Sequence, residues 1–200
     1  MCNDLTRRGF VAGIFAATLM LPALPVVALT PARAEALVDK VVADINRVIA
    51  SGKSESAMYK DFEKIFQRYA DVPIIARSTL GADARRASSA QLRAYTSVFR
   101  GYMSRKYGKR FRDFIGGRVE VQSTRVVRSF HEVRTTAFLR GEPPFEVIFR
   151  VSDKSGKDLF FDMIIEGVSM LQTERAEIGA MLDRRKGSID QLTNDLKKMG

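Results

Sequence analysis

A few side chains of this sequence have the types that acid–base or nucleophilic catalysis uses, but their spacing does not assemble a catalytic group. His131 is the only histidine and falls within a candidate strand, without the positioned partner that proton transfer needs. Asp162 and Glu166 are four residues apart on another candidate strand and share one face, where we expect a surface or turn-anchoring role. Ser169 follows Gly167-Val168 but lacks the glycine that completes a nucleophile elbow.

The sequence also lacks the patterns that bind metals and phosphates. It has no pair of histidines at helical spacing, no acidic calcium loop and no glycine-rich phosphate loop. Cys2 is the only cysteine, so no disulfide can form within the chain. The sequence therefore predicts a protein that is not an enzyme and that carries no metal or other cofactor. The alternative is an exported hydrolase using Ser169 or the Asp162/Glu166 pair, which would lack a general base and an oxyanion element.

Large apolar side chains are plentiful. They recur at helical spacing in the first half of the chain and alternate along candidate strands in the second half. Such stripes either fill an ordinary core or line a cavity for an apolar ligand between a curved sheet and amphipathic helices. Periodicity alone does not separate the two. The candidate pocket residues are Phe66, Tyr69, Ile75, Leu80, Phe99, Tyr102, Met103, Tyr107, Phe111, Val147, Phe149, Phe161, Met163 and Ile165.

The elements that position these residues begin with helices. Three- and four-residue spacing of apolar residues predicts an amphipathic helix over 35–51 and a second over 54–69. The sequence Asp71-Val72-Pro73 breaks the second helix, and a short helix is predicted over 74–80. The longest helical pattern starts near Ser88 and continues through Phe111 toward the glycine pair at 116–117.

From residue 118 the apolar period changes from helical to alternating, which predicts strands. Turn residues between the strands at 140–144 and 153–156 indicate hairpins and hence an antiparallel sheet. The sequence predicts an α+β fold, in which an antiparallel curved sheet of about four strands is covered by N- and C-terminal helices and encloses an apolar pocket. The predicted strands are 118–122, 126–139, 145–151 and 159–165, and the predicted final helices are 174–182 and 188–199.

The first 34 residues are typical of a bacterial export signal. Two arginines in the run at 6–10 precede a weakly apolar stretch at 11–29. Ala32 and Ala34 then form a small-x-small cleavage site, with Glu35 as the expected mature N-terminus. We therefore expect residues 1–34 to be a cleavable twin-arginine-type signal, residues 35–200 to form a single domain, and the mature protein to be periplasmic.

A membrane anchor is the alternative for this segment, because residues 10–29 are nearly long enough to span a bilayer. Pro22 and Pro25 interrupt the stretch and weaken a spanning helix. The formal net charge of +10 would suggest nucleic acid in a cytoplasmic protein. An exported protein meets lipid head groups and acidic partner proteins instead, so we expect no nucleic-acid partner. The alternative interpretation of the charge, a basic surface that only aids solubility, stays open.

Several segments, in order, resemble the toluene-tolerance or Mla-type periplasmic phospholipid-binding family (MlaC-like proteins). Residues 69–81 look like the family's aromatic-Asp-x-x-x-x-Ala-Arg-x-x-Leu-Gly element. Residues 85–92 are similar to the start of a family helix, although Arg85 stands where the family has tryptophan. Residues 160–169 resemble the strand that ends in Glu-Gly-Val-Ser, and Arg175 follows as in the family pattern.

The resemblance implies that residues 35–200 are a single lipid-binding domain, a carrier that holds phospholipid acyl chains in a pocket between sheet and helices. We expect a monomer, because a shuttle must diffuse. The resemblance also implies two partners: an inner-membrane ABC transporter with an MCE-domain ring, and an outer-membrane lipoprotein complex. The carrier would shuttle lipid between them, which would maintain the lipid asymmetry of the outer membrane. Two alternatives stay open: a hopanoid-type lipid carrier of the same family, and a ligand-free envelope adaptor that binds a partner through its basic face.

Overall fold

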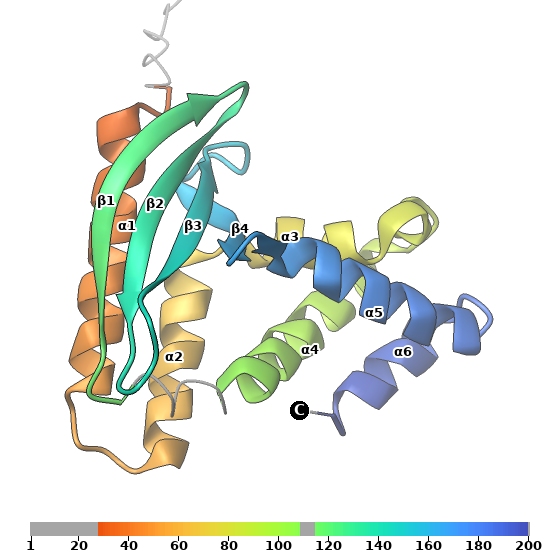
Figure 1. The fold of residues 1–200 in the computed structure, drawn as a ribbon. Helices are drawn as coiled ribbons and strands as arrows, with labels where there is room; N and C mark the ends of the chain where they lie inside the picture. The colour runs from red at the N-terminus through yellow and green to blue at the C-terminus, as the bar shows by residue number, and fades with distance from the viewer. Residues whose placement is uncertain (1–27, 109–114, 200) are drawn as a thin grey trace, which may run out of the picture.

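The computed structural model describes residues 28–108 and 115–199, and it begins with helices (Figure 1). Thr30 caps the first of them, because the Arg33 backbone N–H donates to Thr30 Oγ1 at 3.3 Å. Asp71 caps the third in the same way through Ile74 N–H, at 3.2 Å. The helices are α1 (Pro31–Ile49), α2 (Glu55–Tyr69), α3 (Val72–Thr79), the 3₁₀ helix η1 (Gly81–Arg85) and α4 (Ser89–Gly108).

The sheet follows, with its strands in chain order and every neighbouring pair antiparallel. Register shifts between Val121 and Ser123 in β1 and between Arg150 and Val151 in β3 interrupt the ladders, and such bulges bend strands. Two helices end the chain, α5 (Met170–Arg184) and α6 (Ile189–Leu196). The strands are β1 (Arg118–Val127), β2 (Phe130–Phe138), β3 (Phe145–Ser152), β4 (Leu159–Ile165) and β5 (Val168–Ser169).

The predicted α+β fold with a curved antiparallel sheet is confirmed, and the strands differ from the prediction in two details. The second strand does not begin at Val126, because the chain reverses between β1 and β2, with Arg128 in the left-handed region (φ 52°). A run of two valines hides such a turn from sequence patterns. The two-residue strand β5 was not predicted. The predicted end of the α4 pattern, including Phe111, lies outside the described residues.

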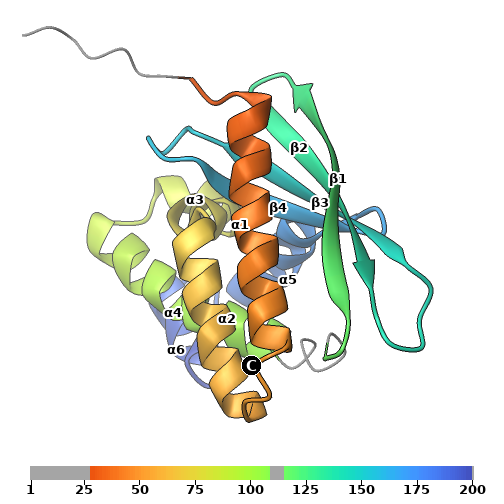
Figure 2. The ribbon, with the colours of Figure 1, turned by 90° about the vertical axis from the view of Figure 1, so that its left-hand side faces the viewer.

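The helices cover one face of the sheet and extend beyond it. In Figure 2, α1 and α2 run side by side, with the sheet beyond α1 and α4 beyond α2. Asn46 on α1 binds the free edge of the sheet: its side-chain amide donates to Val119 O at 3.2 Å and accepts from Val119 N at 3.1 Å. Helix α5 packs on β4, and α6 packs on α4. None of the helices that the structure describes is long and apolar enough to cross a membrane.

One large apolar core joins the helices to the sheet. Tyr95 and Phe99 of α4 are fully buried, and their rings lie 5.6 Å apart. A second aromatic chain links α2 to the sheet, because Phe160 contacts Phe66 at 6.3 Å and Phe149 at 5.6 Å between ring centroids. Such pairs stabilise the fold beyond the area that they bury. The core therefore depends on rings from both the helices and the strands.

Replacing Phe149 by alanine should lower the free energy of unfolding by about 3–5 kcal/mol, the usual cost of removing a buried phenylalanine. Phe149 is 3% exposed and loses its contact with Phe160 in the variant. Urea unfolding followed by circular dichroism measures the change. Val126→Ala is the control, because Val126 is 60% exposed and should change stability by under about 1 kcal/mol. A Phe149→Ala variant as stable as this control would contradict the assignment of Phe149 to the core.

Candidate functional site

The candidate catalytic residues form structural contacts instead of a reactive group. Ser169 Oγ donates to Asp162 Oδ2 at 2.7 Å, and the Leu171 N–H donates to Asp162 Oδ1 at 2.9 Å. Asp162 therefore anchors the connection from β5 to α5, which is the turn-anchoring role that the spacing predicted. Ser169 also accepts from Gln172 N–H as the cap of α5. His131 is buried on β2 and pairs across the ladders with valines of β1 and β3.

Asp162 is the end of an ion ladder that crosses the other face of the sheet. Arg150 donates to Glu132 Oε1 at 3.0 Å and to Asp162 Oδ2 at 3.3 Å, and Arg125 donates to Glu132 Oε2 at 2.8 Å. Burial alone would raise the pKa of Glu132, but the hydrogen bonds from Arg125 and Arg150 outweigh it and hold that pKa below its usual value. The ladder therefore keeps the Glu132 carboxylate ionised and holds both carboxylates in hydrogen bonds to arginines.

A second polar cluster lies between α4 and α5. Glu174 is fully buried; Lys106 Nζ donates to its Oε1 at 2.6 Å, and the Tyr107 hydroxyl donates to the same oxygen. Burial alone would lower the pKa of Lys106, but its bonds to Glu174 and Glu177 raise that pKa above the usual value. Burial, and then the bond to Glu174, raise the pKa of the Tyr107 hydroxyl. At neutral pH Lys106 is charged and Tyr107 is neutral, and their bonds to Glu174 join α4 to α5.

The predicted pocket residues lie in one region, and most of them are packed. Eight belong to the buried core: Tyr69, Ile75, Leu80, Phe99, Tyr102, Met103, Val147 and Phe149. Five are half-buried and pack against that core: Phe66, Tyr107, Phe161, Met163 and Ile165. The half-buried members come from the sheet and from α2 and α4, and the Phe161 ring also packs edge-on against Phe130 of β2. Their role as lipid contacts stays a prediction.

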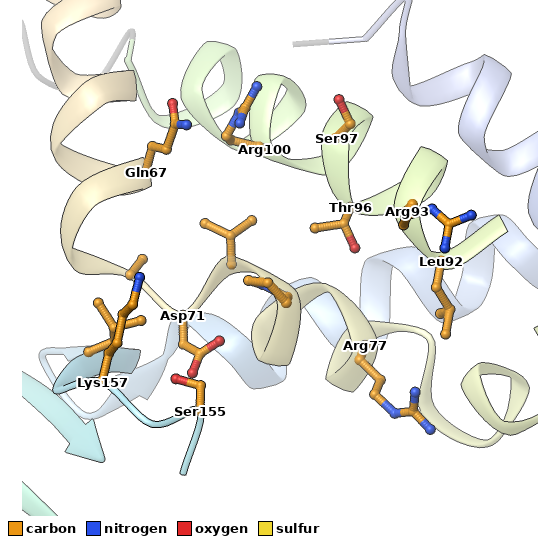
Figure 3. A pocket seen from close by; sticks show the side chains of 14 residues that line it. Gln67, Asp71, Arg77, Leu92, Arg93, Thr96, Ser97, Arg100, Ser155 and Lys157 are labelled. Carbon is orange, nitrogen blue, oxygen red and sulfur yellow. The ribbon is translucent and has the colours of Figure 1, made fainter. Parts of the chain in front are cut away.

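A groove of about 670 Å³ lies elsewhere, between the helices and the hairpin that joins β3 to β4 (Figure 3). Its volume is within the range of small-molecule sites, about 300–1,000 Å³. The end of α2, the start of α3, one face of α4 and the hairpin supply its walls. It is lined by Gln67, Ala70, Asp71, Val72, Pro73, Arg77, Leu92, Arg93, Thr96, Ser97, Arg100, Ser155, Lys157 and Leu159.

The groove combines an apolar floor with a polar rim. Val72, Leu92 and Leu159 are among its apolar members, and Arg77 and Lys157 are exposed cations at its edge. A molecule with one apolar and one polar part would match both surfaces. The part of the chain that the structure describes holds no cluster of three or more residues suited to a metal ion. The arrangement therefore suits binding of an amphiphile more than bond-making chemistry.

Sequence reasoning did not select any residue of this groove, because it followed the large apolar side chains. One signal was present. Leu92, Arg93, Thr96, Ser97 and Arg100 repeat at helical spacing and place one mixed stripe along α4. The two arginines of that stripe have no acidic residue within four positions on the helix, so they are not held by the usual helical ion pairs.

Comparison with known proteins identifies the family of the chain. Residues 35–198 match the family model described as MlaC protein. The chain belongs to the MlaC family. The region that matches the MlaC family contains both the predicted pocket residues and the residues that line the groove.

A solved structure shows the same fold. It is the phospholipid-binding protein from Ralstonia solanacearum, in complex with a phospholipid. The two chains superpose with a TM-score of 0.71 at 19% sequence identity, over 82% of this chain and 95% of the other. The shared fold of this MlaC-family chain therefore persists at low identity.

The Glu174 cluster allows a double-mutant test of its structural role. Lys106→Met should destabilise the protein by about 3–5 kcal/mol, because it leaves the buried Glu174 carboxylate without its counter-charge. Adding Glu174→Gln removes the uncompensated charge and should recover much of the loss. Unfolding by urea at pH 7 gives both values. A double variant no more stable than Lys106→Met alone would show that the ion pair is not the source of the effect.

Proposed function

We propose that this MlaC-family chain is a phospholipid-binding carrier. The observation that carries the proposal is the groove of about 670 Å³, with its apolar floor, hydroxyl groups and cationic edge. A phospholipid has the matching division into acyl chains and a polar phosphate. Burying an acyl chain stabilises a complex by about 0.8 kcal/mol per CH₂, so a short buried length already provides useful affinity. The lipid-bound structural neighbour supports the same class of ligand.

The carrier would act in the periplasm, after export through the twin-arginine-type signal. It would accept lipid from one membrane and deliver it to the other, with an outer-membrane lipoprotein complex and an inner-membrane ABC/MCE transporter as partners. Family membership supports this assignment. A monomer suits a shuttle, because it must diffuse between two membranes. Binding and release require no catalytic group, which agrees with the structural roles of Asp162, Ser169 and Glu174.

The acyl chains have two candidate locations in this proposal. One is the groove. The other is the region of the half-buried apolar residues, where Met163 and Ile165 lie on the core face of β4. A rigid planar hopanoid would suit the same apolar surfaces and is the alternative cargo. A ligand-free adaptor would instead use the basic edge alone and would purify without lipid.

Native mass spectrometry of the exported protein, purified without detergent, tests the function directly. We expect a stoichiometric adduct of phospholipid mass, and lipid extraction should identify it. An adduct of hopanoid mass would identify a hopanoid as the cargo and would still support the carrier function. A ligand-free mass that persists after incubation with liposomes would contradict the carrier function and favour the adaptor.

A matched pair of variants locates the bound lipid. Ser97→Trp places a large ring in the groove, whereas Ala94→Trp places it on an exposed part of the same helix that does not line the groove. We expect Ser97→Trp to weaken lipid binding about tenfold, equivalent to about 1.4 kcal/mol, and Ala94→Trp to leave it unchanged. Equal lipid content in both variants would place the acyl chains among the half-buried residues instead.

A further inference from the structure

We propose that the groove selects phospholipids whose head group carries a net negative charge. This inference rests on the proposed function and adds the class of lipid. Four cations from three elements line the groove: Arg77 of α3, Arg93 and Arg100 of α4, and Lys157 of the β3–β4 hairpin. In Figure 3, Arg77 and Arg93 are drawn near Leu92 toward one end of the groove, and Lys157 toward the other. The positive charge therefore extends along the groove.

Three of these four cations have no ion-pair partner among the residues that the structure describes. Among the residues that the structure describes, Arg77, Arg93 and Lys157 form no ion pair, in contrast to cations such as Arg125 and Arg185, which do. Arg100 has only a 3.7 Å contact to Glu63, and its buried Nε lacks a hydrogen-bond partner. Unpaired like charges around one hollow repel each other, and a bound anion relieves that repulsion.

Among the residues that line the groove, Asp71 is the one carboxylate, against four cations. It is 1% exposed; its Oδ1 caps α3, and its Oδ2 is buried without a hydrogen-bond partner. Hydroxyls of Thr96, Ser97 and Ser155 stand among the cations. Guanidinium and hydroxyl donors together are the usual ligands of phosphate oxygens. The groove thus offers donors and positive charge above an apolar floor, which suits a lipid phosphate.

The charge of the head group should then decide affinity. A zwitterionic lipid brings its own ammonium group, which the four cations disfavour, whereas an anionic lipid brings none. Each cation near an anionic lipid surface contributes roughly fivefold in affinity at moderate salt. We expect an anionic lipid to bind at least about tenfold more tightly than a zwitterionic lipid with the same chains. The preference should shrink as salt rises, because the rim is exposed.

Titration of the delipidated protein with dihexanoyl-phosphatidylglycerol and dihexanoyl-phosphatidylcholine tests this preference. Arg77→Gln/Arg93→Gln removes two of the four cations and should reduce it severalfold, and the matched pair Lys40→Gln/Lys60→Gln, exposed lysines outside the groove, should keep it. Equal binding of both lipids would overturn the inference and leave the carrier function intact. Binding of neither lipid would overturn the carrier function itself. Competition by inorganic phosphate as strong as by phosphatidylglycerol would show a free-phosphate site and overturn the lipid assignment.

An independent observation concerns processing of the export signal: the geometry points to the Ala28–Leu29 bond as the bond that is cut. The predicted site after Ala34 lies within the first turns of α1, and Ala34 is fully buried. A peptidase needs an accessible, extended segment, which a buried helical turn does not supply. Ala28 precedes the helix and is exposed, and Val26-Val27-Ala28 has the small-x-small pattern of a cleavage site.

Residues 29–33 also hold part of the groove in place. Arg33 makes two hydrogen bonds to the Asp158 carboxylate, at 2.8 and 2.9 Å, and the Leu29 N–H donates to Asp153 Oδ2 at 2.9 Å. Asp153 and Asp158 flank Ser155 and Lys157, which line the groove. A cut after Ala34 would remove these tethers and the Thr30 cap of α1. A cut after Ala28 keeps both.

Intact-mass measurement and N-terminal sequencing of the chain exported by a bacterial host decide between the two bonds. We expect Leu29 as the mature N-terminus; Glu35, or an uncut chain, would overturn the inference. Ala28→Leu should block or displace the cut. Ala32→Leu, at an exposed position of α1, alters the later small-x-small site and should leave processing unchanged. Loss of processing in Ala32→Leu alone would also overturn it.

Discussion

The junction between the helices and the sheet at Ala70 and Asp71 is the constraint on which the rest of the structure depends. The chain leaving α2 forms a parallel bridge from Ala70 to Phe160, and the Asp71 N–H donates to Phe160 O at 2.8 Å. The Asp71 side chain caps α3, while the Phe160 ring joins Phe66 of α2 to Phe149 of β3. Backbone and side-chain bonds at one point therefore fix where α2 ends, where α3 begins and how both meet β4. The floor of the groove is built from this same segment.

The sequence signals at this junction were strong, which explains why the fold class was predictable. Asp71-Val72-Pro73 combines a capping carboxylate with a proline in the first turn, so a helix boundary there follows from local chemistry. Hairpin turns such as 153–156 likewise have local causes. The reversal of the chain at Arg128 has no such local cause. It depends on pairing between β1 and β2, and Val126-Val127 continues the strand pattern up to the turn. The two-residue β5 depends on tertiary contacts of Asp162 and has no periodic signal of its own.

The candidate site was less predictable for a related physical reason. Apolar periodicity shows which side chains avoid water, but not whether protein atoms or a ligand fill the space beside them. Phe99 and Met163 follow equally good patterns, yet Phe99 is fully buried and Met163 is half-exposed. The groove arises where α4 stands away from the α2–α3 connection and the hairpin, a distance that no local pattern encodes. Its residues are mostly small or polar, so a search for large apolar residues passes over them. Charge without a local partner, as at Arg93, was the more informative signal.

Unpaired charge also separates the two kinds of polar surface in this protein. Across the sheet, Glu132 and Asp162 meet arginines at hydrogen-bond distance, and at Glu174 a buried carboxylate meets Lys106. These pairs hold strands and helices together. Because their charges are already paired within the protein, they do not attract a charged ligand. In the groove, Arg77, Arg93 and Lys157 form no ion pair with the residues that the structure describes, and the floor is apolar. A carrier must release what it binds, and this division suits reversible binding. Apolar contact supplies affinity that salt does not weaken, while the exposed cations add an attraction that a more strongly charged partner surface competes away.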